Sequence, residues 1–166
     1  MDRQQIGVKL TIDALKLSFQ IDGFMDRLIM QKAVYLAQAA GVNLGYYYHW
    51  YLHGPYSPSL TRDEFAVAMD ISAGMDESKG WKLDDKSSQR LEEMRGLFAG
   101  AEADRDELAK KLELLASVHF LIDRKQASKA DASRITATLR LFDKPFSEKD
   151  VMNALGELTR YDLLPA

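Results

Sequence analysis

His49 and His53 are the residues whose type and spacing come closest to a metal site. Histidines four residues apart lie on one face of a helix, where they can bind one zinc ion together. Here they belong to the run YYYHWYLH, which alternates like a strand, and four residues of a strand span roughly 13 Å. That separation is too large for two ligands of one zinc ion, which lie about 2 Å from the metal. We therefore predict no metal site, and two histidines at a strand edge beside aromatic rings.

The other reactive side chains are arranged as in an ordinary core or a solvated surface. His119 continues a stripe of leucines at positions 108, 112 and 115, which predicts a buried core histidine. The adjacent carboxylates at 84–85 and 92–93 lie in charged stretches that we expect to face water. The chain has no cysteine, and it lacks a P-loop and the motifs G-x-S-x-G, G-x-G-x-x-G and H-x-E. We therefore predict a protein that is not an enzyme and binds no cofactor.

The segment over residues 46–58, YYYHWYLHGPYSP, is the most distinctive part of the sequence. It places six aromatic residues and two of the chain's three histidines within thirteen positions. Alternation predicts a strand over 46–53, with the more apolar even positions on one face and the amphipathic odd positions on the other. The Gly-Pro pair at 54–55 is predicted to end this strand. Ser57 and Pro58 then match the cap and first position of a helix.

The turn Gly54-Pro55-Tyr56-Ser57-Pro58 has two interpretations. Its two prolines and its helix cap fix the backbone, so neighbouring tyrosines can present large side chains at low cost in conformational entropy. That combination suits a protein-binding surface. Alternatively, the turn only orients the strand and the next helix, and its aromatic residues close the core. The two interpretations are compatible.

Helical periodicity accounts for most of the remaining chain. Apolar residues three or four apart predict a helix from Ile6 to Ile21, and a helix that is apolar almost all round is predicted over 24–40. Further helices are predicted over 57–73, 86–98, 108–122, 135–142 and 147–158. The predicted fold is mainly α: a compact bundle of six to seven helices in a single domain, residues 1–166. A short β element is expected around 46–53, and the GWKLD segment at 80–84 is a candidate for a second one.

Charge and hydropathy favour a cytoplasmic protein with no membrane association. The 166 residues carry a net charge of −3, with 46% hydrophobic and 28% charged residues, which is an ordinary globular composition. No apolar run approaches the roughly 18 residues that a membrane span needs, and the N-terminus lacks the pattern of a signal peptide. The lack of cysteine fits a reducing compartment.

A winged-helix DNA-binding regulator is the alternative function that the sequence leaves open. A helix, a strand, a capped helix and the GWKLD segment follow one another in the order of a winged helix. Residues 123–144 hold six basic and three acidic side chains, which form either a phosphate-binding patch or an ordinary solvated helix face. The expected recognition helix, SLTRDEFAVAMD, has one arginine and three carboxylates, the wrong sign for DNA. We therefore expect a protein partner in preference to nucleic acid.

Two motifs of this chain resemble a known family. The helix over 24–40 contains Leu28, Gln31, Lys32, Tyr35 and Gln38, which resemble the pattern L-x-Q-K-h-x-Y-h-h-Q with one extra residue after the leucine, where h is apolar. The aromatic segment then contains W-Y-x-x-G-P-Y-S-P at 50–58. These motifs resemble the YwgA-like proteins and, more distantly, the Panacea (SocA-like) antitoxin domain. The resemblance covers residues 24–72, a family-bearing core segment, whereas the helical remainder at 86–166 adds no motif.

The resemblance implies a helical, non-enzymatic module that binds another protein inside the cell. Panacea-type proteins resemble antitoxins that neutralise a toxin by direct binding, so the implied partner is a cognate toxin or a defence protein, in a toxin–antitoxin or phage-defence context. A homo-oligomer is equally compatible with the sequence. We predict that the partner-binding surface contains Gln31, Lys32, Tyr47, Tyr51, Gly54, Pro55, Tyr56, Ser57 and Pro58.

Overall fold

Seven α-helices and one two-stranded sheet dominate the part of the chain that the computed structural model describes, residues 1–100 and 103–165. The helices are α1 (Arg3–Ala14), α2 (Phe24–Ala39), α3 (Pro58–Ser72), α4 (Asp85–Glu93), α5 (Arg105–Asp123), α6 (Ala132–Leu141) and α7 (Glu148–Arg160). The strands are β1 (His49–Tyr51) and β2 (Gly54–Tyr56), and short 3-10 helices cover η1 (Glu77–Gly80) and η2 (Arg95–Phe98). The prediction of a mainly helical bundle with a short β element is confirmed.

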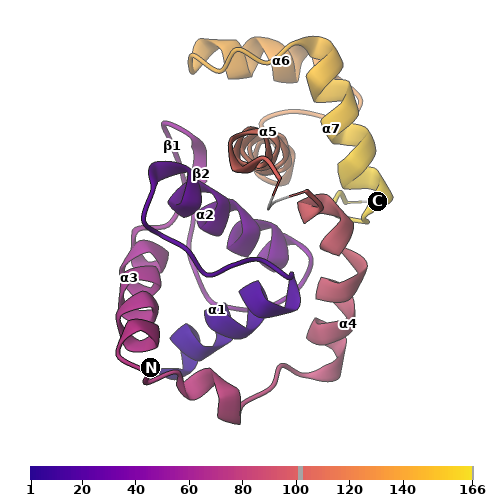
Figure 1. Cartoon of the computed structure of the whole chain (residues 1–166). Helices are drawn as coiled ribbons and strands as arrows, with labels where there is room; N and C mark the ends of the chain where they lie inside the picture. Colours follow the sequence, from indigo (N-terminus) through magenta and orange to yellow (C-terminus); the bar gives the residue numbers. More distant parts are fainter. Residues whose placement is uncertain (101–102, 166) are drawn as a thin grey trace.

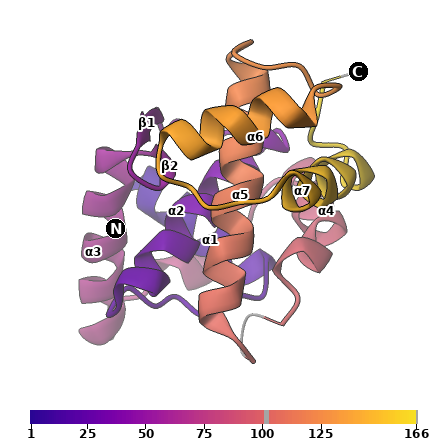
Figure 2. The same cartoon turned by 90° about the horizontal axis from the view of Figure 1, so that it is seen from above.

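α2 and α5 lie side by side in the middle of the molecule (Figures 1 and 2). Figure 1 shows α3 to the left of this pair and α7 to its right, with α1 below α2, between α3 and α4. Both central helices bury most of their side chains, as expected for helices with apolar residues on nearly every face. Because β2 packs against both of them, the sheet rests on the best-buried part of the fold.

α1 is shorter than the apolar pattern predicts, because the chain leaves the helix after Ala14. Lys16 adopts a left-handed conformation with φ of 60°. Its N–H donates to the carbonyl of Asp13, and the N–H of Leu17 donates to that of Ile12. These two hydrogen bonds form a Schellman motif, which ends helices and usually has glycine at the left-handed position. A lysine at that position gave no stop signal, so the prediction of a helix to Ile21 was wrong.

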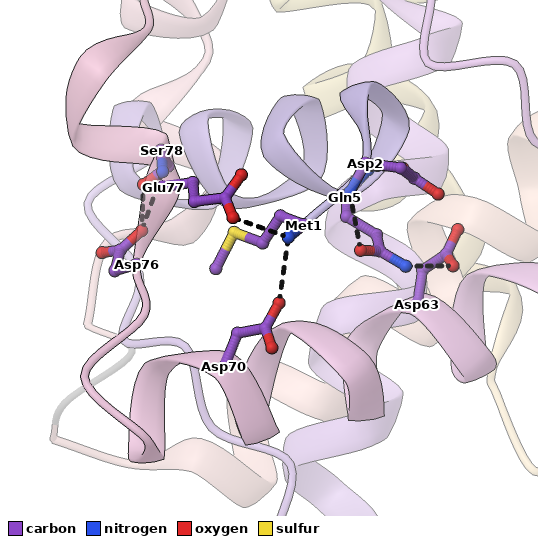
Figure 3. A network of polar contacts seen from close by, with 8 residues as sticks. All are labelled: Met1, Asp2, Gln5, Asp63, Asp70, Asp76, Glu77 and Ser78. Carbon is purple, nitrogen blue, oxygen red and sulfur yellow. Dashed lines mark hydrogen bonds and ion pairs between the residues drawn. The ribbon is translucent and has the colours of Figure 1, made fainter.

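The start of α1 is fixed by side chains that also reach α3 (Figure 3). The carboxylate of Asp2 accepts from the N–H of Gln5, and the side chain of Gln5 accepts from the N–H of Asp2, which forms a capping box. The amide nitrogen of Gln5 also donates to Asp63 on α3 at 3.1 Å. The amino group of Met1 lies 3.2 Å from the carboxylate of Asp70, near the end of α3.

The predicted starts of α3 and α7 agree with the structure. Ser57 caps α3 with Pro58 in its first turn, and Ser147 forms a capping box with Asp150 at the start of α7. The helix predicted over 86–98 is interrupted: α4 ends at Glu93, and the chain continues as a 3-10 helix over Arg95–Phe98.

The aromatic segment forms a hairpin instead of one long strand. β1 pairs with β2 in antiparallel register, with His49 opposite Tyr56 and Tyr51 opposite Gly54. The predicted end of the strand at Gly54 is therefore the start of its partner, because the chain reverses at Leu52 and His53. Inward and outward side chains do alternate as predicted up to Tyr51. Leu52, predicted to face inward, is exposed because it belongs to the turn.

Residues 80–84 do not form the second β element that the GWKLD segment allowed. η1 ends at Gly80, and residues 81–84 have no regular structure before α4 begins at Asp85. Trp81 is exposed. A winged helix needs a hairpin wing after its recognition helix, and the described part of the chain has no strand after α3.

Candidate binding site at the hairpin

Residues 46–57, which we call the hairpin segment, are fastened to α2 at both ends through main-chain atoms. The side chain of Gln38 accepts from the N–H of Tyr46 at 2.9 Å and donates to its carbonyl oxygen at 3.0 Å. Gln31 does the same for Ser57, with both distances 3.0 Å. Each carboxamide therefore satisfies both polar backbone groups of one residue, as a neighbouring strand would do.

Two lysines hold the middle of the hairpin segment through its carbonyl groups. Lys32 of α2 donates from Nζ to the carbonyl oxygen of Pro55 at 2.6 Å. Lys144, just after α6, donates to the carbonyl oxygen of Leu52 at 2.7 Å. Lys144 also pairs with the carboxylate of Glu113 on α5 at 2.7 Å. The turn is thus tied to a charged pair that belongs to the other half of the chain.

Lys32 is a cationic residue in an environment that disfavours its charge. Its side chain lies in the core, and the residue is only 1% exposed. Burial lowers the pKa of Lys32 to about 7, although the nearby carboxylate of Glu113 acts in the opposite direction. The amine therefore gains or loses its proton close to neutral pH.

Gly54 allows the hairpin to lie directly on α5. It has a φ of +81°, and a Cβ atom at this position would lie 2.3 Å from Oγ of Ser117. Both observations require glycine, because L residues rarely adopt this backbone conformation and any side chain would overlap α5. The close contact fixes the distance between β2 and α5.

A pocket of about 270 Å³ opens between the hairpin, α2 and the first turns of α3. We call it the hairpin pocket. It is lined by Phe24, Arg27, Leu28, Gln31, Lys32, Tyr51, Leu52, His53, Gly54, Tyr56 and Thr61. Five of the residues that the sequence predicted for partner binding are thus brought together around one pocket.

Exposed apolar groups surround the hairpin pocket. Tyr51 is 61% exposed and Leu52 is 72% exposed, and Phe24 across the pocket is also exposed. The rings of Tyr51 and Tyr56 lie 5.6 Å apart, and those of Phe24 and His53 lie 5.0 Å apart. Clustered exposed apolar groups around a pocket are typical of an interaction site.

The predicted partner-binding residues divide into two groups by position. Gln31 and Lys32 are buried, and their polar atoms hold the hairpin segment in place. Pro55, Ser57 and Pro58 do not line the hairpin pocket. They shape the turn and start α3, which corresponds to the structural interpretation of the Gly-Pro-Tyr-Ser-Pro sequence.

Tyr47 lies outside the hairpin pocket and lines a second cavity. It is 83% exposed. The cavity has a volume of about 580 Å³ and lies between the end of α2, the start of the hairpin segment, the end of α5 and the chain near residue 164. Tyr35 and His119 line it, and Oη of Tyr35 lies 2.7 Å from Nδ1 of His119. We call it the Tyr35–His119 cavity.

His119 is a buried histidine, as the sequence predicted. Burial lowers its pKa below the ordinary value, because the charged imidazolium would lose its hydration. Tyr35 is also buried and packs edge to face on Tyr48. The pair is therefore a satisfied polar contact inside the core, with Asp123 near the surface of the same cavity.

The two histidines of the hairpin have different surroundings. His49 is exposed on β1. His53 lies with Nδ1 3.3 Å from a carboxylate oxygen of Glu113. Within residues 1–100 and 103–165, no three histidine, cysteine or acidic side chains are grouped as metal ligands.

Trp50 joins the hairpin to the C-terminal helices. Its ring lies 5.7 Å from that of Phe120 on α5 and 5.1 Å from that of Phe142 after α6. The ammonium group of Lys144 lies 5.8 Å from the ring centre. Trp50 is half-buried in this cluster, so it belongs to the packing of the hairpin.

Glu64 is one of the three carboxylates in the segment SLTRDEFAVAMD, and it is fully buried in the structure. Within the described residues, neither of its carboxylate oxygens has a hydrogen-bond partner. Burial raises the pKa of Glu64 to about 8, so the group is mostly protonated at neutral pH. The acidic character of α3 therefore comes from Asp63 and Asp70.

Several residues of the hairpin pocket were not predicted as site residues. Phe24, Arg27 and Leu28 precede Gln31 on α2, and the polar stripe that contains Arg27 and Gln31 was visible in the sequence. Because Arg27 and Gln31 lie four residues apart in that stripe, the sequence indicated that both side chains point to the same side of α2. Thr61 gave no such signal, because its place depends on how α3 packs.

Comparisons with family models, curated proteins and solved structures found no significant match to this chain. Among the described residues, no helix is both long enough and apolar enough to cross a membrane.

Proposed function

We propose that this chain is a non-enzymatic protein-binding module that holds its partner at the hairpin pocket. The observation that carries this proposal is the combination of exposed Tyr51 and Leu52 with a main chain that is tied down at both ends. A pre-organised apolar surface binds with little loss of conformational freedom. It therefore favours stable recognition of another folded protein.

The kind of partner follows from the family resemblance of the same residues. A YwgA-like and distantly Panacea-like module is expected to act in the cytoplasm as an antitoxin or regulatory adaptor. In that role it would neutralise a toxin, or adapt a defence protein, by covering part of its surface. The exposed hairpin supplies the surface, and the buried lysine and glutamine of α2 keep it in shape.

The test is co-expression with the product of the neighbouring gene, followed by purification through a tag on this chain. We expect a one-to-one complex, and we expect silencing of the partner if the partner is toxic alone. Tyr51→Ala and Leu52→Ala should reduce the recovered partner at least tenfold, because both side chains lie at the pocket. Leu141→Ala is the matched control, since Leu141 on α6 is even more exposed, at 83%, and lies outside the pocket.

Tyr47→Ala decides which of the two cavities holds the partner. The hairpin pocket requires that Tyr47→Ala retain the complex, because Tyr47 lines the other cavity. A complex that survives Tyr51→Ala and is lost with Tyr47→Ala would contradict the proposed site. A purification that recovers no stoichiometric partner would contradict the proposed function.

A further inference from the structure

The ionisable side chains that line the hairpin pocket are all basic, apart from two tyrosines. Arg27, Lys32 and His53 line it, and no aspartate or glutamate among the described residues does. The chain as a whole has a net charge of −3, so this local arrangement differs from the average surface. A cleft lined by one sign of charge attracts groups of the other sign.

The cationic groups retain hydrogen-bonding capacity beyond their known contacts. Arg27 uses Nη1 for the carbonyl groups of Ile21 and Asp22, whereas a guanidinium has five N–H donors. Lys32 uses one of three donors for the carbonyl of Pro55. An occupant of the pocket would therefore meet donors and should supply acceptors.

Glu113 is a carboxylate near the pocket that already has other partners. Glu113 pairs with Lys144 and lies 3.3 Å from Nδ1 of His53. It lies outside the set of residues that line the pocket. Glu113 thus acts on Lys32 through its charge, and Glu64 lies near Arg27, yet neither carboxylate lines the pocket.

The size and the apolar walls of the hairpin pocket specify the rest of the occupant. Small-molecule sites usually have about 300–1,000 Å³, and this pocket has about 270 Å³. Leu28, Leu52 and the ring of Phe24 provide apolar walls. These walls suit an aliphatic side chain, and a free phosphate would leave them unused.

We propose that the hairpin pocket binds an internal acidic segment of the partner protein, in which a carboxylate side chain stands next to an aliphatic side chain. The aliphatic group packs on Phe24 and Leu52, and the carboxylate faces Arg27 and Lys32. This inference rests on the proposed function, because it names the chemistry of the partner at the same site. Charge complementarity and pocket size are the observations that select this occupant.

Binding should be linked to protonation of Lys32. A carboxylate beside Lys32 favours the ammonium form and raises its pKa from about 7 in the free protein. The charged groups that act on Lys32 are Glu113 and Lys144, and the ionisable side chains that line the pocket with it are Arg27 on the same helix, His53 on the hairpin, and two tyrosines. The affinity should therefore be greater at pH 6.5 than at pH 8.5, where the amine is mostly neutral.

The experiment is an NMR titration of the full chain with two dipeptides, acetyl-Leu-Glu-amide and acetyl-Leu-Gln-amide. We expect both to shift the resonances of residues 51–56, with half-saturation at about tenfold lower concentration for the acidic dipeptide at pH 6.5. Lys32→Met should keep only the part of the preference for the acidic dipeptide that Arg27 supplies, and it should lose the dependence on pH. Lys125→Met, which changes an exposed lysine outside the pocket, should behave as the wild type.

Several outcomes would overturn this inference. Equal binding of the two dipeptides by the wild type would remove the role of charge. Tighter binding of inorganic phosphate, or of acetyl-leucine with its terminal carboxylate, would assign the pocket to a different ligand. A pH dependence that persists in Lys32→Met and disappears in His53→Gln would reject Lys32 as the responsive group. Thermal unfolding of each variant confirms that it is folded.

The inference and the proposed function fail in different ways. If the partner is captured through Tyr51 and Leu52 while the dipeptides show no charge preference, the binding function stands and the acidic segment is rejected. If no partner depends on the hairpin, the proposed function is rejected whatever the dipeptides do.

Discussion

The two ends of the hairpin segment are fastened by the same chemistry in different surroundings. Gln38 holds both backbone groups of Tyr46, and Gln31 holds both backbone groups of Ser57. The contacts to Ser57 are buried, whereas those to Tyr46 are only partly buried. The same side chain is therefore expected to contribute more to stability at the second end.

The cavities next to the two ends also differ in charge. The hairpin pocket near Gln31 has Arg27, Lys32 and His53 and no acidic side chain among the described residues. The Tyr35–His119 cavity near Gln38 contains two aspartates and one arginine. The two glutamines attach the segment in the same way, whereas the side chains that a ligand would meet differ between the two cavities.

Gly54→Ala should have the largest effect on stability. The new Cβ would lie 2.3 Å from Oγ of Ser117, at a φ of +81°. Positive φ costs an L residue about 1–2 kcal/mol, and overpacking typically adds about 1–3 kcal/mol. We expect a loss of about 3 kcal/mol in the free energy of unfolding, measured by urea denaturation.

Gly45→Ala is the matched control at the other end of the segment. Gly45 has a φ of +78°, and its Cβ would meet only the amide of Gln4 at 3.5 Å. It should cost only the backbone contribution of about 1–2 kcal/mol. Combining Gly54→Ala with Ser117→Ala should restore part of the loss. Equal losses for the two single variants would refute the close contact with α5.

Gln31→Leu should destabilise the protein more than Gln38→Leu. The first variant leaves the buried N–H of Ser57 without a partner, and a buried unsatisfied group costs about 1–3 kcal/mol. The carbonyl of Ser57 loses one of its two donors and still accepts from the N–H of Thr61. We expect a loss of about 2–3 kcal/mol for Gln31→Leu, and about 1 kcal/mol for Gln38→Leu because water reaches Tyr46 more easily. Chemical denaturation measures both. The reverse order would show that burial does not decide the strength of these contacts.

Lys32 of the hairpin pocket and His119 of the other cavity should make stability depend on pH in different ranges. The pKa of Lys32 is about 7 in the folded state and 10.5 as its ordinary value, so the unfolded chain binds more protons between these values. The wild type should therefore gain stability relative to Lys32→Met as the pH rises from 7 towards 10, by at most about 1.4 kcal/mol per pH unit. Thermal unfolding of both proteins across this range measures the difference. A difference that is constant from pH 7 to pH 10 would refute the lowered pKa.

His119 should affect the pH dependence of stability only in the acidic range. Burial lowers its folded pKa below the ordinary value of 6.5, so stability is lost as the pH falls below 6.5. His119→Gln should reduce this loss and leave the behaviour above pH 7 unchanged. The same thermal unfolding series, extended to pH 5, tests the prediction. A variant that still loses stability as steeply as the wild type would assign the acid response to other groups.

The sequence predicted local features well where a side chain signals its own role. Ser57 and Pro58 start α3, and Ser147 with Asp150 starts α7, as their types require. The alternation of the aromatic residues predicted which of them face the core up to Tyr51. These features depend on neighbours only a few residues away.

The rest depended on residues far apart in the chain or on backbone states without a signal. α1 ends at a lysine in a left-handed conformation, where a glycine would have been recognised. The turn of the hairpin is fixed by Lys144 and Glu113, which lie on other elements and gave no motif. Gly54 looked like a strand end, because its contact with Ser117 exists only in the folded chain.

The anchoring of the hairpin through main-chain atoms has a consequence for how its sequence can change. Gln31, Gln38, Lys32 and Lys144 bind carbonyl and N–H groups, which every residue except proline provides in full. Side chains at the exposed positions 47, 49, 51 and 52 can therefore be exchanged without loosening the support. The binding specificity of the hairpin can therefore change, by evolution or by design, through its exposed side chains while the backbone contacts that hold it stay the same.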